Sequence, residues 1–255
     1  MLGKCYLYGL GVPANSKKAV TYFKKSLEEI ESKFNLALLF FYGVGVRKSK
    51  KMGMQLMQEC MDANYIDAFL YLGGMYLEGD VVDFDEKKGF ECFSHAAELG
   101  SGAGCFNLAT LYQNGQGVKK DVKKALELLN KAVELSYYKA YCNIGYFYLQ
   151  GVGVHSDYKK AFEYFTEGSK YDPRNYNNLG YMYMTGVGVT LDKEKGFTMY
   201  KKGAELGDSS CCLFLGNCYM SGDGVKRDKK KALVWYKKAA ELGDPRAAAL
   251  VSTLS

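Results

Sequence analysis

The chain has 255 residues, of which 48% are hydrophobic and 24% are charged, and it carries a net charge of +6. Only three prolines and no low-complexity stretch occur, which excludes a disordered chain. No run of about 18 apolar residues occurs, so no membrane-spanning helix is predicted. The first six residues, MLGKCY, lack the pattern of a secretory signal, but the chain begins part-way through a repeat and its native start stays open.

A short glycine motif recurs along the whole chain at a nearly constant interval. Gly-x-Gly-Val or a close variant occurs seven times, with its first glycine at Gly9, Gly43, Gly79, Gly115, Gly151, Gly186 and Gly222. Subtraction gives intervals of 34 to 36 residues. Such a period is typical of repeat proteins in which each repeat packs only on its neighbours. Positions are numbered below by their offset from the first glycine of their repeat.

Each repeat is predicted to form two helices joined by the glycine motif. In repeat 4, apolar or small residues follow helical spacing at Gly104, Leu108, Leu111 and Tyr112. The glycines then permit positive φ and end this first helix. Position +6 always carries a residue type that caps helix N-termini: Asn15, Ser49, Asp85, Asp121, Asp157, Asp192 and Asp228. A second helix therefore begins there and ends near +21.

These boundaries predict an all-α fold, with residues 1–255 forming a single α/α solenoid of about seven helix–loop–helix repeats. The repeats are expected at about 1–30, 31–64, 65–100, 101–136, 137–172, 173–207 and 208–243, followed by a partial C-terminal helix over 244–255. The first repeat lacks most of its first helix. Its uncapped apolar end could pair with another copy, so self-association stays open.

Small and aromatic residues also recur with the period. Position −6 holds only glycine or alanine: Gly3, Ala37, Gly73, Ala109, Gly145, Gly180 and Gly216. Glycine within a helix costs about 1 kcal/mol relative to alanine, so we predict that two backbones approach closely there. Position −3 carries Phe40 in repeat 2 and tyrosine in the others, and we predict that this series is core. A Tyr112→Ala change would then cost about 3–5 kcal/mol.

The metal-binding and redox residue types show no periodic arrangement. Eight cysteines scatter over different offsets, whereas a disulfide framework in a repeat protein would recur with the period. We predict free, mostly buried thiols and a reducing, cytoplasmic compartment. The two histidines, His95 and His155, are isolated, so neither a metal site nor a cofactor is predicted.

Basic residues gather at 47–51, 119–124 and 226–231, at equivalent places in their repeats. We interpret these clusters as a solvated face. Nucleic-acid binding would favour interleaved arginines and aromatics, and only four arginines occur. Binding to nucleic acid or to an anionic membrane remains an alternative.

Two segments carry a family resemblance. Residues 140–161, AYCNIGYFYLQGVGVHSDYKKA, and residues 237–243, KKAAELG, resemble the Sel1-like repeat, which is related to tetratricopeptide repeats. The resemblance covers essentially the whole chain, although repeat 3 reads Gly79-Asp80-Val81-Val82 and lacks the second glycine. It implies a right-handed α-superhelix and a non-catalytic scaffold or adaptor that binds another protein.

One face of the first helices is left over from packing. Positions −12, −8, −5 and −1 align on one stripe, because they are spaced by four, three and four residues. We hypothesise that repeats 4–6 form a groove here for an extended or acidic peptide, bound by Asn107, Lys139, Asn143, Tyr146, Arg174, Asn178 and Tyr181. The alternative is that the asparagine, recurring at −8, has a structural role and bonds to a neighbouring loop.

An enzyme is the remaining alternative. Some cysteine-rich bacterial relatives are associated with binding or hydrolysing β-lactams, and they carry a regular pair of cysteines in each repeat. This chain lacks that pairing. It also lacks the nucleophile, zinc-protease and phosphate-loop motifs of known enzyme classes, so no catalytic residue is predicted.

Overall fold

The computed structural model describes residues 2–254, with side chains up to Thr253, and contains fifteen α-helices in that range. The chain divides into two compact parts, the N-terminal half (1–128) and the C-terminal half (129–255). The division falls within α8 (Val122–Glu134). No helix of the described residues is both long and apolar enough to cross a membrane.

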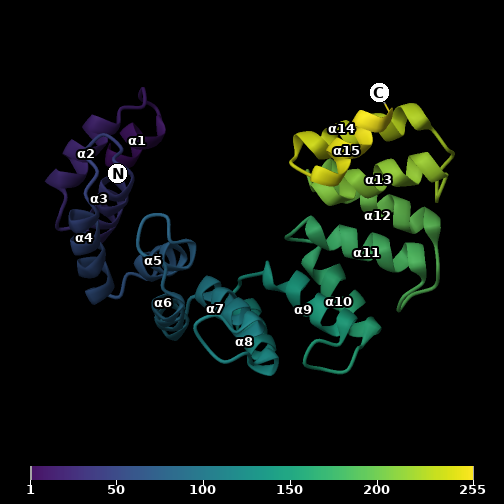
Figure 1. The fold of residues 1–255 in the computed structure, drawn as a ribbon, viewed down its shortest axis with the longest axis horizontal. Coiled ribbons are helices and arrows are strands. Elements are labelled where there is room, and N and C mark those ends of the chain that lie inside the picture. Colours follow the sequence, from purple (N-terminus) through teal and green to yellow (C-terminus); the bar gives the residue numbers. More distant parts are fainter. Residues whose placement is uncertain (1, 255) are drawn as a thin grey trace. The chain divides into compact units, whose positions relative to one another are not determined.

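Each half is a run of sequential helix pairs (Figure 1). The N-terminal half contains α1 (Leu2–Tyr8), α2 (Ser16–Lys25), α3 (Ile30–Tyr42), α4 (Lys50–Asp62), α5 (Ile66–Glu78), α6 (Glu86–Glu98) and α7 (Gly102–Asn114). The C-terminal half contains α9 (Ala140–Gln150), α10 (Tyr158–Gly168), α11 (Arg174–Thr185), α12 (Lys193–Glu205), α13 (Ser209–Ser221), α14 (Lys229–Glu241) and α15 (Pro245–Leu254). From α1 to α7 and from α9 to α15, each helix packs on the next. The predicted all-α helix-pair solenoid is confirmed, whereas the prediction of one continuous array over 1–255 stays a prediction.

The predicted end of the first helix and start of the second helix are confirmed in every repeat. The first glycine adopts a left-handed conformation, from φ 67° at Gly151 to φ 88° at Gly222. The side chain at +6 accepts a backbone N–H three residues later in all seven repeats, as Asp157 does from Lys160 at 3.0 Å. The backbone N–H of the same residue donates to the carbonyl at −3, at 2.9 Å from Asp157 to Tyr148. Each hairpin is therefore closed at a fixed position on both helices.

The predicted approach of two backbones at −6 is confirmed where two glycines face each other, because an alanine Cβ at Gly89 or Gly196, at +10 of the second helix, would lie 3.3 or 3.1 Å from the carbonyl oxygen of Gly73 or Gly180. The small residues at −6 also make room for a large side chain at +14. An alanine Cβ at Gly145 would lie 2.5 Å from Cε1 of Phe165, a fully buried residue at +14 of the same repeat. The rule extends along the sequence. Glycine at −6 goes with Phe23, Phe93, Phe165, Tyr200 or Tyr236 at +14, and alanine goes with Met57 or Leu129.

The aromatic series at −3 is less buried than predicted. Phe40 is buried, but the tyrosines at this position are only half-buried. In at least five repeats the ammonium group of the lysine at +9 lies over the tyrosine ring, as Lys160 does over Tyr148 at 5.2 Å. One lysine of each such repeat therefore packs on its own hairpin, and the +14 series supplies the central aromatic core.

The eight cysteines are free thiols, and six of them are buried, which confirms their predicted burial. Burial raises the pKa of Cys60 to about 11 and the pKa values of Cys92 and Cys218 to about 12. These thiols behave as small apolar core residues.

Candidate protein-binding site

The seven residues hypothesised to bind a partner lie on three first helices. Asn107 lies on α7 in the N-terminal half, and the other six lie at the start of α9, on α9 and on α11 in the C-terminal half. Lys139, Tyr146, Arg174 and Tyr181 are exposed, and the three asparagines are half-buried. The C-terminal half therefore presents six of the seven from two first helices.

The recurring asparagine has no common structural partner. Asn35 is buried and donates to the carbonyl of Glu31 at 2.6 Å within its own helix. Asn178 donates to Sγ of Cys142 on α9 at 3.4 Å, which links two first helices. Asn107 and Asn143 make no side-chain hydrogen bond within residues 2–254. Their amides are available to a ligand, because a half-buried amide with no partner keeps two donors and an acceptor.

Arg174 already holds a carboxylate of this chain. Its Nη2 lies 2.5 Å from Oδ2 of Asp172, and its Nε lies 2.9 Å from the same oxygen. Burial acts to raise the pKa of Asp172, but the bonds from the guanidinium and from the Arg174 backbone N–H outweigh it and lower that pKa. Arg246 and Asp244 repeat the arrangement at the start of α15. An acidic partner would have to share Arg174 with Asp172, which leaves Lys139 as its main cationic contact.

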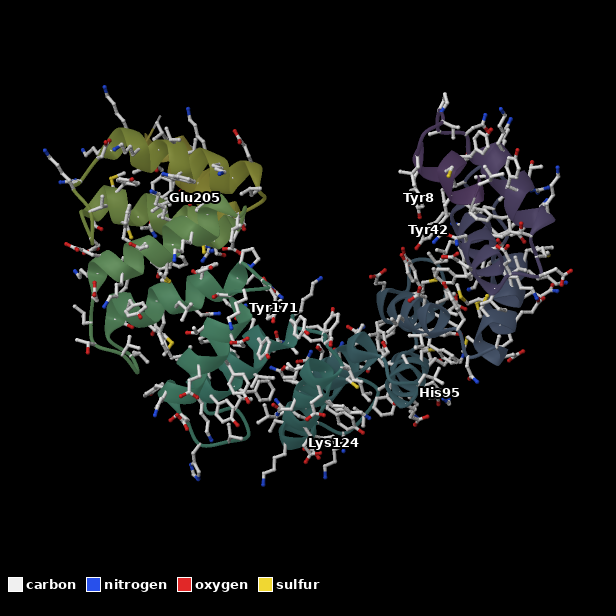
Figure 2. The ribbon with its side chains drawn as sticks, turned by 180° about the vertical axis from the view of Figure 1, so that it is seen from behind. Tyr8, Tyr42, His95, Lys124, Tyr171 and Glu205 are labelled. Atoms are coloured by element: carbon white, nitrogen blue, oxygen red, sulfur yellow. The ribbon has the colours of Figure 1, made fainter. Side chains whose placement is uncertain are left out.

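The stripe collects exposed tyrosines. Among described residues, every exposed tyrosine of a first helix lies at −8, −5 or −1, and their exposed fractions run from 46% to 64%: Tyr8, Tyr42, Tyr71, Tyr146 and Tyr181. In Figure 2, Tyr8 and Tyr42 lie one above the other at the ends of α1 and α3. Tyrosine supplies a large contact area at low entropic cost, so this distribution favours binding along the stripe.

The stripe is hollowed between α3 and α5. A depression of about 400 Å³ is lined by Tyr42, Leu70, Tyr71, Gly74, Met75 and Glu78. Gly74 stands at −5, where repeats 5 and 6 carry Tyr146 and Tyr181, and a Cβ on it would meet no atom within 4 Å. The missing side chain therefore opens the hollow between two exposed tyrosines. Sequence reasoning placed the groove in repeats 4–6 and missed this one, because position −5 varies from repeat to repeat and Gly74 did not stand out.

The glycine-motif repeats match one known family. The Sel1 repeat matches residues 1–29, 30–59, 67–101, 102–137, 139–170, 176–208 and 209–244. These seven segments cover most of the chain. A search of the curated proteins finds no match.

Several solved structures are similar to the chain, two of them over nearly its full length. A Sel1 repeat protein from Oxalobacter formigenes is 26% identical with a TM-score of 0.80, over 100% of this chain and 74% of that protein. A protective antigen of uropathogenic Escherichia coli strains, displaying an SLR fold, is 27% identical with a TM-score of 0.79 over 92% of this chain. The chain spans only about half, 51%, of that antigen. An immunity protein from Pseudomonas aeruginosa is 26% identical with a TM-score of 0.55, over 72% of this chain and 68% of that protein.

Proposed function

Because the chain belongs to the Sel1 repeat family, whose members generally bind other proteins, we propose that it is a non-catalytic scaffold that binds an extended segment of a partner protein along the stripe. The observation that carries this proposal is that tyrosine occupies five of the exposed positions on this face of the first helices, where a polar residue would suffice for the fold. Structural needs do not require it, because half-exposed rings add little to the core. In the C-terminal half, the unpartnered amide of Asn143 offers hydrogen bonds to a peptide backbone beside Tyr146.

A displayed library of random peptides tests this proposal. Peptides selected on the wild-type chain are measured by fluorescence anisotropy against Tyr146→Ser/Tyr181→Ser and against Asn143→Ala. The matched control is Tyr158→Ser/Val234→Ser, which removes two exposed apolar side chains from the second helices α10 and α14. We expect the double tyrosine variant to lose about tenfold or more in affinity, since aromatic anchors dominate such interfaces. The control variant should bind the selected peptides with the wild-type affinity.

Two results would contradict the proposal. Equal losses in the stripe and control variants would show that the peptides bind elsewhere. Steady turnover of a chromogenic β-lactam such as nitrocefin by the purified chain would show an enzyme instead of a scaffold.

A further inference from the structure

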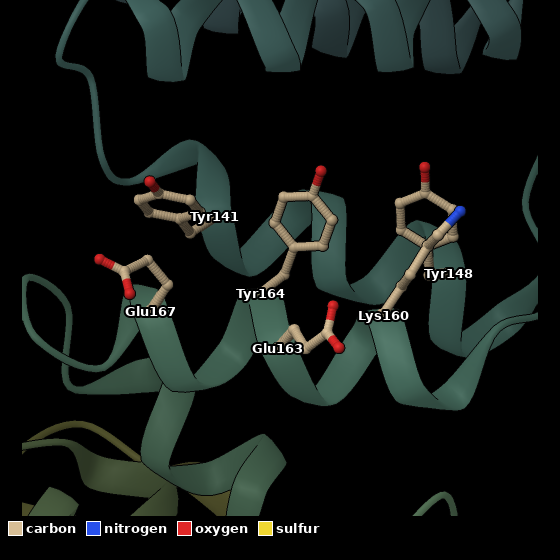
Figure 3. A pocket seen from close by; sticks show the side chains of 6 residues that line it. All are labelled: Tyr141, Tyr148, Lys160, Glu163, Tyr164 and Glu167. Carbon is tan, nitrogen blue, oxygen red and sulfur yellow. The ribbon is translucent and has the colours of Figure 1, made fainter.

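The C-terminal half holds a second cavity, away from the stripe. A hollow of about 470 Å³ between α9 and α10 is lined by Tyr141, Tyr148, Lys160, Glu163, Tyr164 and Glu167. Figure 3 shows Tyr164 between Tyr141 and Tyr148, with the carboxylate of Glu167 near Tyr141 and that of Glu163 between Tyr164 and Lys160. On α10 the lining residues are spaced by three, one and three, so they share one face of the helix. The volume lies within the range of small-ligand sites.

The tyrosines form a continuous series of rings. Tyr148 and Tyr164 are stacked at 5.6 Å and 9°, and Tyr164 lies 6.2 Å from Tyr141. Tyr171 continues the series, 6.2 Å from Tyr141, and stacks on Tyr138 at 4.0 Å. Ring faces at these spacings offer a flat, electron-rich wall to a planar cation.

The repeat architecture does not account for this series. The three lining tyrosines stand at −10, −3 and +13, and repeat 5 combines tyrosine at all three. At +13, repeats 2 and 4 carry Leu56 and Leu128, so the hairpin forms equally well with an aliphatic residue there. Repeat 1 carries the same stacked pair at −3 and +13, Tyr6 and Tyr22 at 5.3 Å and 7°. The feature particular to repeat 5 is the third ring, Tyr141 at −10, beside such a pair.

The cavity is lined by two carboxylates and one ammonium group, whereas the chain as a whole carries a net charge of +6. Glu163 has no ion-pair partner among the described residues, and Glu167 contacts Lys170 at 2.5 Å. Lys160 is held at the far end, over the Tyr148 ring and 3.7 Å from Asp157. A cation therefore already occupies the Tyr148 face. At the Tyr141–Tyr164 end Glu167 is held by Lys170, which follows α10, and the Glu163 carboxylate is left without an ion-pair partner among the described residues.

We propose that this cavity binds an arginine side chain of a basic segment in a partner polypeptide. The guanidinium would stack on the Tyr141 and Tyr164 rings, donate to the unpaired carboxylate of Glu163 and share the carboxylate of Glu167 with Lys170. Arginine fits better than lysine because its planar group stacks on rings and bonds a carboxylate through two N–H groups. Burial, the largest influence, raises the pKa values of both hydroxyl groups, so the rings stay neutral.

The test uses three synthetic peptides of equal length, with arginine, lysine or citrulline at the same positions, and measures binding to the full chain by calorimetry. We expect saturable binding of the arginine peptide and binding about tenfold weaker for the lysine peptide. Citrulline keeps the planar shape but carries no charge, so that peptide should not bind. Equal binding of the lysine and arginine peptides would overturn the proposal.

Two variants test whether the arginine peptide binds in this cavity. Glu163→Gln/Glu167→Gln removes both carboxylates, and Tyr164→Leu introduces the residue that repeats 2 and 4 already carry. Each variant should bind the arginine peptide with about tenfold or more lower affinity than the wild-type chain. The control Glu205→Gln/Glu241→Gln makes the same change in net charge on α12 and α14 and should bind normally. Equal weakening by the control would show non-specific attraction and overturn the proposal, whereas the stripe variants should leave this binding unchanged.

Discussion

The ring of Phe165 occupies the space that a side chain at Gly145 would need. The Cβ of an alanine at Gly145 would lie 2.5 Å from Cε1 and 2.7 Å from Cδ1 of that ring. Both residues belong to repeat 5, and Phe165 is fully buried. The same relationship joins Gly180 to Tyr200 and Gly216 to Tyr236, each at 2.5 Å. A glycine on one helix and a ring on the other thus fill one volume together.

A double variant tests this relationship. We expect Gly145→Ala to destabilise the chain by about 1–3 kcal/mol, because overpacking outweighs the gain in helix propensity. Phe165→Leu alone should also destabilise, because it leaves a cavity. The pair Gly145→Ala/Phe165→Leu recreates the Ala109 and Leu129 combination of repeat 4 and should recover stability. Urea denaturation of all four proteins gives the coupling energy, and simple additivity would refute the shared volume.

Replacing either of two adjacent glycines on α5, Gly73 or Gly74, by alanine should change the stability of the chain in opposite directions. A Cβ at Gly74 would meet nothing within 4 Å, so Gly74→Ala should stabilise the chain by up to about 1 kcal/mol. It would also narrow the hollow between Tyr42 and Tyr71 and weaken any peptide bound there. Gly73→Ala should destabilise instead, because its Cβ would lie 2.9 Å from Cε1 of Phe93. Thermal denaturation of the two variants checks the contrast, and a shared sign would be inconsistent with this packing.

The Asp172–Arg174 pair predicts a loss of stability in acid. The pKa of Asp172 is lowered in the folded chain, so folding favours its carboxylate form. Its contribution is therefore present above the unfolded pKa of about 3.9 and is lost as the pH falls through the lower, folded value. Asp172→Asn should cost about 1 kcal/mol at pH 7, since the half-exposed Arg174 is screened by solvent. The difference in free energy of unfolding between the two proteins should shrink as the pH falls below about 3.9. A difference that stays unchanged in this range would contradict the assignment.

Native thiol labelling should separate the cysteines by burial. Raised pKa values near 11 for Cys60 and near 12 for Cys92 and Cys218 leave almost no thiolate at pH 8, and burial also excludes reagents. We expect iodoacetamide to modify the half-buried Cys5 and Cys142 first and the six buried thiols only after denaturant is added. Mass spectrometry of the native and denatured samples reports the order. Rapid native modification of Cys92 would show that its helix pair opens.

The helix ends could be predicted because their causes are local. The capping residue at +6, such as Asp157, and the first glycine, such as Gly151, act on backbone groups within one turn of the helix. Their residue types alone are therefore enough to predict where a helix begins or ends. The ring packing could not be predicted from the small residues alone, because Gly145 meets a partner twenty residues later. The correlation was nevertheless present in the sequence, since glycine at −6 always accompanied an aromatic residue at +14.

The candidate site was predictable in outline but not in detail. Helical arithmetic placed Tyr146 and Tyr181 on an exposed face, because it needs only the period of the helix. The hollow beside Gly74 was not predicted, because a glycine gives no sign in the sequence that a cavity lies next to it. The pairing of Arg174 was also missed, although the tripeptide Asp-Pro-Arg occurs at both 172–174 and 244–246.

The space between positions −6 and +14 is filled either by glycine and a ring or by alanine and an aliphatic side chain. This choice restricts how the gene of a repeat protein of this kind can recombine. Duplicating or deleting a whole repeat keeps each glycine with its ring and each alanine with its aliphatic partner. A crossover inside a loop that joined α9 to the helix of another repeat would succeed only with a donor of the aromatic class, such as α12 or α14. The period of the array therefore defines the unit in which it can lengthen or shorten without losing its core.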